Sequence, residues 1–398
     1  MNHLTKNFLE YFFLFGILML PLYIFSFNLF GIPTNVSETI IVFYLSFFVA
    51  LKRKTILENI QSLPSWYTLS IFLIFLGIIS SILYPGNFSL HGLGIIKGWF
   101  VLPVLFSFSG FMLFKKDSFF KIFYAIYSSS FFVALSSIIY LFQKNLTFDG
   151  RLKAFYLSPN QLSMFLIFSF FIFPLIMTKM KSSFSKILLV ISFIPIIIST
   201  YLTFSYSVWI SAFISIIFSA ILIGDFFFKK NGTVLMVLSI FVLFVFFQIN
   251  NQKMLSVFNE RSSLYSRVMI WKSSFKIATD NPLFGIGPGN FQKKYLEYQK
   301  FFPPYLEWAV PHPHSLYFSF WLQAGILGLI GVVIMLFKSI LFLVSNKKTA
   351  FSAALLVSIL YISIHGIFDT TVWKNDLSYL FWLFILMIPS TENQKSSL

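Results

Sequence analysis

About twelve apolar stretches, each close to the length needed to cross a lipid bilayer, make up most of this chain. A hydrocarbon core about 30 Å thick needs about 20 apolar residues per helical crossing. With 58% hydrophobic and only 11% charged residues among 398, the chain needs lipid to solvate its apolar surface. We therefore predict an all-α, polytopic integral membrane protein with one transmembrane domain over residues 1–398. The predicted spans lie near residues 9–31, 37–51, 66–84, 93–114, 119–142, 159–178, 184–204, 207–228, 232–249, 315–344, 349–368 and 376–390.

Basic residues predict the orientation of these spans, because cytoplasmic loops carry an excess of lysine and arginine. The opposing short loops 31–38 and 84–90 carry no basic residue, so both chain termini are predicted to be cytoplasmic. The first span follows Lys6 and has no small-residue cleavage site after it, so we expect it to be retained. The basic set of alternate loops holds Lys52, Arg53, Lys54, Lys115, Lys116, Lys179, Lys181, Lys229, Lys230, Lys347 and Lys348.

The net charge of +16 is explained mostly by these loops and by anionic lipid, so nucleic acid is not an expected partner. Arginine is the more informative basic residue, because only four of the 29 basic residues are arginine and three of them fall on the predicted outer side. A guanidinium group binds phosphate with two parallel hydrogen bonds, which an ammonium group cannot do. Arg151 and Arg267 are therefore candidate ligands for an anion, whereas Arg261 has Glu260 beside it as a simpler partner.

A mixed polar segment, residues 250–314, interrupts the apolar runs and is predicted to be an extracytoplasmic loop between the ninth and tenth spans. Within it the apolar positions 264, 268, 271, 275 and 278 recur at spacings of four and three, which predicts an amphipathic helix that Asn281 and Pro282 end. The glycines at 285, 287 and 289 follow. They allow left-handed backbone angles, so Gly287 belongs either to an anion-binding nest or to a simple tight turn.

Two histidines close this segment in the sequence Pro311-His312-Pro313-His314. His314 stands at the entrance of the tenth span, where a helix N-terminus disfavours the imidazolium and leaves a neutral imidazole that can act as a general base. The alternative is a structural histidine bonded to a backbone carbonyl. We expect no metal site, because two histidines without an evident third ligand fall short of zinc geometry and the chain has no cysteine.

Three further polar residues are candidates at the same predicted side of the membrane. Ser158 and Pro159 are typical of a helix start, so Asn160 is expected in the first turn of the sixth span, close in sequence to Arg151. Lys97 and Asp369 border their spans, where ionisable residues are functional candidates by default. They are expected either to line the floor of the loop or to extend to the interface.

Three passages together resemble the O-antigen ligase and polymerase family of bacterial membrane glycosyltransferases. They run from Arg151 to Asn160, from Ser266 to Phe291 and from His312 to Gly328. The similarity covers roughly residues 90–390. Two departures stand out: Tyr206 occupies a position where many relatives have arginine, and Ser315 one where relatives often have asparagine.

The resemblance implies an inner-membrane enzyme, with its active site facing the periplasm, that moves a glycan from undecaprenyl pyrophosphate to lipid A-core without a cofactor or a required metal. It implies pyrophosphate binding by Arg151 and Arg267, a functional histidine at His314 and a late polar residue at Asp369. Transfer to another carrier-linked repeat, as in a polymerase, and transfer to a protein hydroxyl stay open. A transporter of lipid-linked sugars is the alternative from another class, although paired halves and acidic residues in mid-span are not evident.

Overall fold

The computed structural model describes residues 3–52, 56–114, 118–224, 232–249, 251–255, 262–303, 308–346 and 349–389, whose regular secondary structure is helical apart from one β-hairpin. The first half contains α1 (His3–Leu18), the 3₁₀ turn η1 (Leu20–Ile24), β1 (Ser26–Leu29), β2 (Ile32–Asn35), α2 (Val36–Lys52), α3 (Ile56–Gln61), α4 (Ser65–Leu83), α5 (Leu90–Ile96), the π-helical turn η3 (Lys97–Val101), α6 (Leu102–Leu113), α7 (Phe120–Phe142), α8 (Pro159–Lys179) and α9 (Ser183–Leu202). The second half contains α10 (Tyr206–Ile223), α12 (Gly232–Phe246), α13 (Gln252–Leu255), α14 (Ser263–Asp280), α15 (Phe291–Tyr298), the 3₁₀ turn η5 (Gln299–Phe301), α16 (Leu316–Ser345), α17 (Ala350–His365) and α18 (Asn375–Met387).

Each predicted span overlaps a helix of the structure, and the number of about twelve membrane crossings stays a prediction. Within the described residues, seven helical stretches are long and apolar enough to cross a membrane, and three shorter apolar helices accompany them. A polytopic helical membrane protein is thereby confirmed. Several basic residues on which the orientation was predicted, namely Arg53, Lys54, Lys115, Lys116, Lys229, Lys230, Lys347 and Lys348, lie outside the described residues, as does Arg261.

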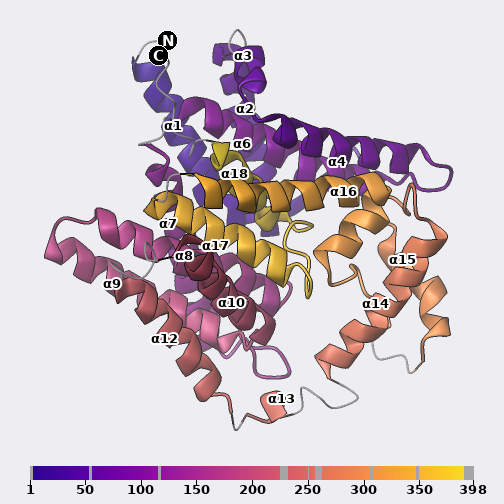
Figure 1. Cartoon of the computed structure of the whole chain (residues 1–398). Coiled ribbons are helices and arrows are strands. Elements are labelled where there is room, and N and C mark those ends of the chain that lie inside the picture. Colours follow the sequence, from indigo (N-terminus) through magenta and orange to yellow (C-terminus); the bar gives the residue numbers. More distant parts are fainter. Residues whose placement is uncertain are drawn as a thin grey trace.

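The helices α8, α17 and α18 form the centre of the bundle (Figure 1). Almost every residue of these three helices is buried, which is expected of helices that are apolar on all sides. Around them α10 packs on α17, α6 on α18, and α4 along α16. Helix α14 packs against α16, and α15 packs against α14, away from α9 and α12 (Figure 1).

The first span is shorter than predicted. Its helix α1 ends at Leu18, and the chain then forms the hairpin of β1 and β2, so the predicted extension to residue 31 is wrong. Pro21 cannot continue an α-helix, and Phe30 and Gly31 take positive φ angles of 51° and 78°, as the two central residues of a type I′ hairpin turn require. Asn35 at the end of the hairpin then caps α2 by accepting a hydrogen bond from the backbone N–H of Glu38 at 2.9 Å.

The amphipathic helix predicted in the polar segment is confirmed as α14, but its buried face differs from the prediction. The side chains at 266, 269, 270, 273, 274, 277 and 278 are buried, so position 278 of the predicted apolar stripe is buried as expected. Val268 and Phe275 of that stripe are 38% and 55% exposed. Three of the buried positions are serines, whose small size lets α14 approach its neighbours closely. Val268 and Phe275 therefore face away from the protein core, whereas Met269, Ile270 and Ile277 are buried.

Helix α16 is broken at Gly325. The turn between α14 and α15 (residues 281–290, called the glycine turn below) packs against this break. Gly325 has φ 63° and ψ −171°, and a Cβ there would overlap the carbonyl oxygen of Leu283. Ile326 donates its N–H to that oxygen at 3.2 Å, and Ile286 donates its N–H to the carbonyl of Leu322 at 2.6 Å. Backbone groups freed by the break are thus satisfied by the polar segment, which is fixed on the bundle as a result.

Candidate functional site

Two loops that are distant in sequence meet at the start of α16. The carbonyl of Gly366, directly after α17, accepts hydrogen bonds from the N–H of Leu316 at 2.7 Å and from the hydroxyl of Ser315 at 3.3 Å. His314 precedes this contact with a positive φ of 47°, which is uncommon for a residue with a side chain. The prolines on either side of His312 and the anchored Gly366 thereby bring the histidine loop against the loop that follows α17.

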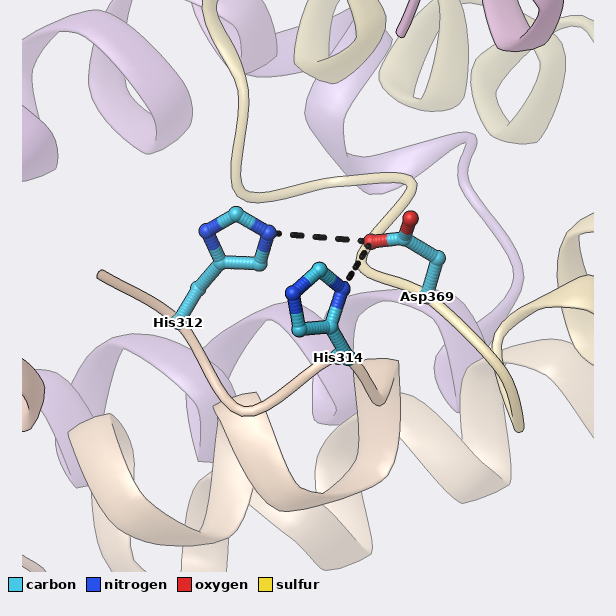
Figure 2. Close-up of side chains that lie close together, drawn as sticks. All are labelled: His312, His314 and Asp369. Atoms are coloured by element: carbon cyan, nitrogen blue, oxygen red, sulfur yellow. Dashed lines mark ion pairs between the residues drawn. The ribbon is translucent and has the colours of Figure 1, made fainter. Parts of the chain in front are cut away.

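Asp369 lies at the centre of this contact (Figure 2). Its Oδ1 lies 3.4 Å from Nδ1 of His314, 3.8 Å from Nε2 of His312 and 3.3 Å from Nζ of Lys374. The Asp369 side chain is 1% exposed, so water does not screen these interactions. One buried carboxylate therefore faces two imidazoles and one ammonium group.

The surroundings of Asp369 decide its charge. Burial opposes its ionisation, but Lys374, His314 and His312 together stabilise the carboxylate and hold the pKa of Asp369 well below its ordinary value. The same burial, helped by the positive charge of nearby Lys374, holds the pKa of His312 well below its ordinary value. At neutral pH the cluster therefore combines an ionised carboxylate with a neutral His312.

The backbone of His314 is fixed by α14. The indole N–H of Trp271 donates to the carbonyl oxygen of His314 at 3.1 Å. Because Nδ1 of His314 is the nitrogen nearest Asp369, its Nε2 is the nitrogen left to face a substrate. A carboxylate beside one imidazole nitrogen stabilises the tautomer in which that nitrogen carries the proton, so the other nitrogen can accept one.

Arg267, one turn before Trp271 on α14, reaches the same region. Its positive charge is among the causes that lower the pKa of His312 and also the pKa of Arg151, so all three groups lie within electrostatic reach of one another. Within the described residues, the buried Nε of Arg267 has no hydrogen-bond partner. A buried donor without a partner is costly, and an anionic ligand would satisfy it.

Arg151 is held in place by the loop before α10 and by the first turn of α8. Its Nε donates to the carbonyl of Thr203 at 2.7 Å, and its Nη2 donates to Oδ1 of Asn160 at 2.7 Å and to Oγ of Ser205 at 3.3 Å. The ion pair from its Nη1 to Asp149 is long, at 3.9 Å. Burial is the main cause that lowers the pKa of Arg151, and the repulsion of Arg267 adds to it. Two arginines that repel each other form a site that is suited to a multiply charged anion.

The start of α8 has the structure that its sequence predicts. Ser158 is the N-cap, with its hydroxyl accepting from the N–H of Gln161 at 3.2 Å, and Pro159 is the first helical residue. Asn160 follows in the first turn, where its side-chain oxygen also accepts from the hydroxyl of Ser205 at 2.9 Å. In this structure Asn160 therefore orients Arg151.

His312, His314 and Asp369 also form a set of metal-ligand type. One ligand atom from each of these residues lies within 4.8 Å of the others. The prediction that no third ligand accompanies the histidines is wrong, because the fold brings Asp369 to them. The ammonium of Lys374 contacts the same carboxylate oxygen of Asp369 at 3.3 Å. A metal ion bound to that oxygen would therefore be repelled by the ammonium group or would have to displace it.

Two predicted site residues have structural partners elsewhere. The ammonium of Lys97 contacts Oε2 of Glu38 at 2.8 Å, the carbonyl of Pro33 at 2.7 Å and the hydroxyl of Thr34 at 2.8 Å, which ties η3 to the hairpin. Gly287 packs on the loop between α4 and α5, where a Cβ would lie 2.8 Å from the carbonyl oxygen of Asn87. These contacts favour the tight-turn interpretation of Gly287 and the structural interpretation of Lys97.

Lys374 also belongs to the cluster around Asp369, although the sequence did not predict it as a site residue. Its side chain is 11% exposed and it is the N-cap residue of α18. The signal was a lysine beside the last span, five residues after Asp369 in the same predicted outer loop. Tyr206, where the resemblance predicts an arginine, lies within electrostatic reach of Arg151, and its hydroxyl donates to Oε1 of Gln248 at 3.1 Å.

These features define a polytopic helical membrane protein in which a buried carboxylate faces two partly exposed histidines, with two arginines within electrostatic reach of the cluster or of each other. Residues 187–333 match the family model described as O-antigen ligase, which confirms the predicted resemblance over that segment. Members of this family are membrane glycosyltransferases that use lipid-linked glycans. Arg267, His312 and His314 lie within the matched residues, whereas Arg151 and Asp369 lie outside them. No curated protein matches the chain.

Proposed function

We propose that this protein transfers a glycan from undecaprenyl pyrophosphate to the hydroxyl group of an acceptor sugar. The observation that carries the proposal is the contact between His312 and Asp369, with Arg267 within electrostatic reach of it and Arg151 within electrostatic reach of Arg267, since these groups come from three separate segments of the chain. The family match supports a lipid-linked glycan as the substrate. The arginines supply the charge that a pyrophosphate needs, and the histidine–carboxylate pair supplies a base.

In the proposed reaction the bond between the sugar C1 and the pyrophosphate oxygen breaks, and a bond forms between C1 and the acceptor oxygen. The acceptor proton goes to Nε2 of His314, while Asp369 stabilises the imidazolium that results. The departing pyrophosphate takes the bonding electrons, and Arg151 and Arg267 stabilise its growing negative charge. No redox partner is involved, and the proton and the leaving group both have a defined destination.

The topology follows from the same proposal. We place the chain in the bacterial inner membrane with about twelve crossings, with both termini in the cytoplasm and the site facing the periplasm. Segment 250–314 then supplies Arg267, His312 and His314, while the loops after α7 and α17 supply Arg151 and Asp369. What supports this placement is the basic content of the alternate loops and the way the predicted outer loops pack on one another.

The test uses purified protein, a polyprenyl-pyrophosphate glycan and lipid A-core. We expect Arg267→Ala and His314→Ala to abolish transfer while the protein stays inserted and folded. Matched controls are Lys272→Ala, an exposed basic residue on the same helix, and His91→Ala, an exposed histidine beside the glycine turn. Full activity in both site variants would reject the proposal.

The acceptor is tested separately in cells that lack the protein. A ligase leaves long polymer on the carrier lipid when it is removed, whereas a repeat-unit polymerase leaves single repeats there. We propose the ligase reaction, and accumulation of single repeats would reassign the protein as a polymerase. An unchanged glycan profile in these cells would contradict both the ligase and the polymerase assignment.

A further inference from the structure

The π-helical turn η3 interrupts the helix formed by α5 and α6 with one widened turn. The backbone N–H of Leu102 donates to the carbonyl of Lys97, five residues before it, where an α-helix would use the carbonyl four residues before. Pro103 follows and has no N–H, so the carbonyl of Trp99 lacks its α-helical donor. Trp382 of α18 donates its indole N–H to that carbonyl at 3.3 Å. The widened turn thereby offers α18 a backbone acceptor that a regular helix would use internally.

Side chains of η3 also hold the two residues that flank Lys374. The indole N–H of Trp99 donates to Oδ1 of Asn375 at 2.6 Å, and this hydrogen bond joins residues that lie 276 positions apart in the chain. The ring of Phe100 meets the ring of Trp373 edge to face, with their centroids 4.6 Å apart. Trp373 is 2% exposed, so packing fixes its position. Lys374 therefore stands between two residues that the same turn anchors.

The anchored backbone of Lys374 makes its ion pair easier to form. Lys374 is the N-cap residue of α18, with an extended backbone of φ −152° and ψ 144°. Its Nζ donates to Oδ1 of Asp369 at 3.3 Å, and its side chain is 11% exposed. Holding a long, flexible lysine side chain in one geometry costs conformational entropy. This cost is lower where the backbone is already fixed, because only the side chain then has to be ordered.

The turn η3 is itself held from its other side by the hairpin. Lys97, its first residue, contacts the Glu38 carboxylate at 2.8 Å and the carbonyl of Pro33 at 2.7 Å. Gly98 makes this approach possible, because a Cβ there would overlap the Glu38 carboxylate. Glu38 is 4% exposed, so water screens its charge little. The turn is therefore a rigid support between the hairpin and α18.

We infer that η3 positions the ammonium group of Lys374 against the carboxylate of Asp369. Trp99 and Asn375 are accordingly positioning residues of the candidate site. The inference rests on the proposed function for the role of Asp369 beside His314. The ammonium of Lys374 lies 3.3 Å from the carboxylate oxygen that His314 faces at 3.4 Å, and it is the nearest of the three basic groups that contact this oxygen within the described residues. Its displacement would leave a buried carboxylate less well held beside the base.

The alternative is that the hydrogen bond from Trp99 to Asn375 only stabilises the bundle. Hydrogen bonds between helices are common in membrane proteins and contribute modestly to stability. A purely structural bond predicts that its loss lowers stability and nothing else. A positioning bond predicts that its loss also lowers kcat and makes the amine of Lys374 more reactive.

The first experiment measures kcat and the donor KM of Trp99→Phe, which removes the indole N–H and keeps an aromatic ring. We expect kcat to fall by about tenfold, because the base is less well oriented. The donor KM should change by less than about twofold, because the arginines that bind pyrophosphate are untouched. Asn375→Ala should have the same effect as Trp99→Phe. The double variant should be no worse than either single variant, because both remove the same hydrogen bond.

Tyr44→Phe is the matched control for the loss of a buried hydrogen bond. The hydroxyl of Tyr44 donates to Oγ of Ser109 at 2.7 Å, which joins α2 to α6. Its loss should lower the Tm in detergent, as Trp99→Phe does, and leave kcat at the wild-type value. Equal kcat values in Trp99→Phe and Tyr44→Phe, or additive losses of kcat in the double variant, would overturn the inference.

The second experiment requires no transfer and measures the reactivity of Lys374 directly. The protein is treated with an amine-reactive ester, and mass spectrometry follows the acylation of each lysine. The rate at Lys374 should rise by about three- to tenfold in Trp99→Phe, as expected for the loss of one hydrogen bond. Lys293, an exposed residue of α15, should react at the same rate in both proteins. An unchanged rate at Lys374, or an equal rise in Tyr44→Phe, would contradict the positioning role.

The two experiments separate this inference from the proposed function. If the wild type transfers no glycan, the proposed reaction fails, and the acylation rates still decide whether η3 positions Lys374. If transfer depends on Arg267 and His314 while Trp99→Phe keeps the wild-type kcat and the wild-type reactivity of Lys374, the inference fails and the proposed reaction stands.

Discussion

Replacement of Asp369 by asparagine removes one negative charge from the centre of the histidine cluster and preserves its shape. The carboxylate is 1% exposed and contacts Lys374 at 3.3 Å and His314 at 3.4 Å. With an effective dielectric constant of about 20, a unit charge pair at the first distance attracts by about 5 kcal/mol before the cost of burying both charges. Asparagine leaves the ammonium of Lys374 buried without a counter-charge, for which we expect a stability loss of about 3–5 kcal/mol.

The catalytic effect of the same change is expected to be larger than its effect on donor binding. An amide beside Nδ1 of His314 neither favours the required tautomer nor stabilises the imidazolium, so kcat should fall by about 10²–10⁴-fold. The KM for the donor should change little, because the arginines that bind pyrophosphate are untouched. The assay is transfer from a purified polyprenyl-pyrophosphate glycan to lipid A-core, with kcat and KM determined separately.

Two further variants separate catalysis from stability. Asp369→Asn combined with Lys374→Gln removes the uncompensated charge, so it should regain stability without regaining activity. Asp376→Asn changes another carboxylate that is 1% exposed, one held by Gln161 at 3.4 Å and by the backbone N–H of Leu377 at 3.0 Å, and it should retain transfer. If Asp369→Asn keeps the wild-type kcat, the assigned relation between Asp369 and His314 is refuted.

Two other predictions concern pH and the break in α16. Burial lowers the pKa of His312, so below about pH 6.5 the unfolded chain takes up a proton that the folded protein does not. The free energy of unfolding therefore decreases as the pH falls below about 6.5, by at most about 1.4 kcal/mol per pH unit. The Tm in detergent should therefore fall less on acidification in His312→Gln than in the wild type, and an equal fall would contradict the assigned burial. Gly325→Ala combines a positive φ of 63° with overlap of the Leu283 carbonyl, so it should destabilise the protein by more than the roughly 1–2 kcal/mol expected from the backbone angle alone. Gly86→Ala is its control, since Gly86 has φ 85° and open space around it. Equal losses of stability in the two variants would show that the close approach of the Leu283 carbonyl to Gly325 does not contribute to the effect.

Much of the fold was readable in the sequence because its signals are local. Runs of apolar residues located the helices, and Ser158 with Pro159 located the start of α8. The hairpin after α1 was missed because its residues are apolar enough to extend a span, while its turn depends on the backbone angles of Phe30 and Gly31. The face on which α14 packs was missed because it combines the serines at 266, 273 and 274 with the apolar residues Met269, Ile270 and Ile277, and serines do not predict burial.

The resemblance predicts that Arg151, Arg267, His314 and Asp369 serve one site, but the sequence did not predict which atoms of these residues are in contact. Arg151, Arg267 and His314 stood out as residue types suited to the chemistry, each within its own segment. Lys97 stood out for the same reason, and its partners turned out to be Glu38 and the hairpin. A residue type in a suitable place therefore does not show which partner it has.

The sequence alone determined that the chain is a bundle of membrane helices with a polar segment carrying arginine and histidine, because hydropathy, capping and turn preferences act between near neighbours. Only the tertiary structure decided that Asp369 and Lys374 join the histidines, and that η3 holds the residues on either side of Lys374. These contacts join segments far apart in the chain. They depend on how broken and close-packed helices fit together, and no local pattern encodes that fit.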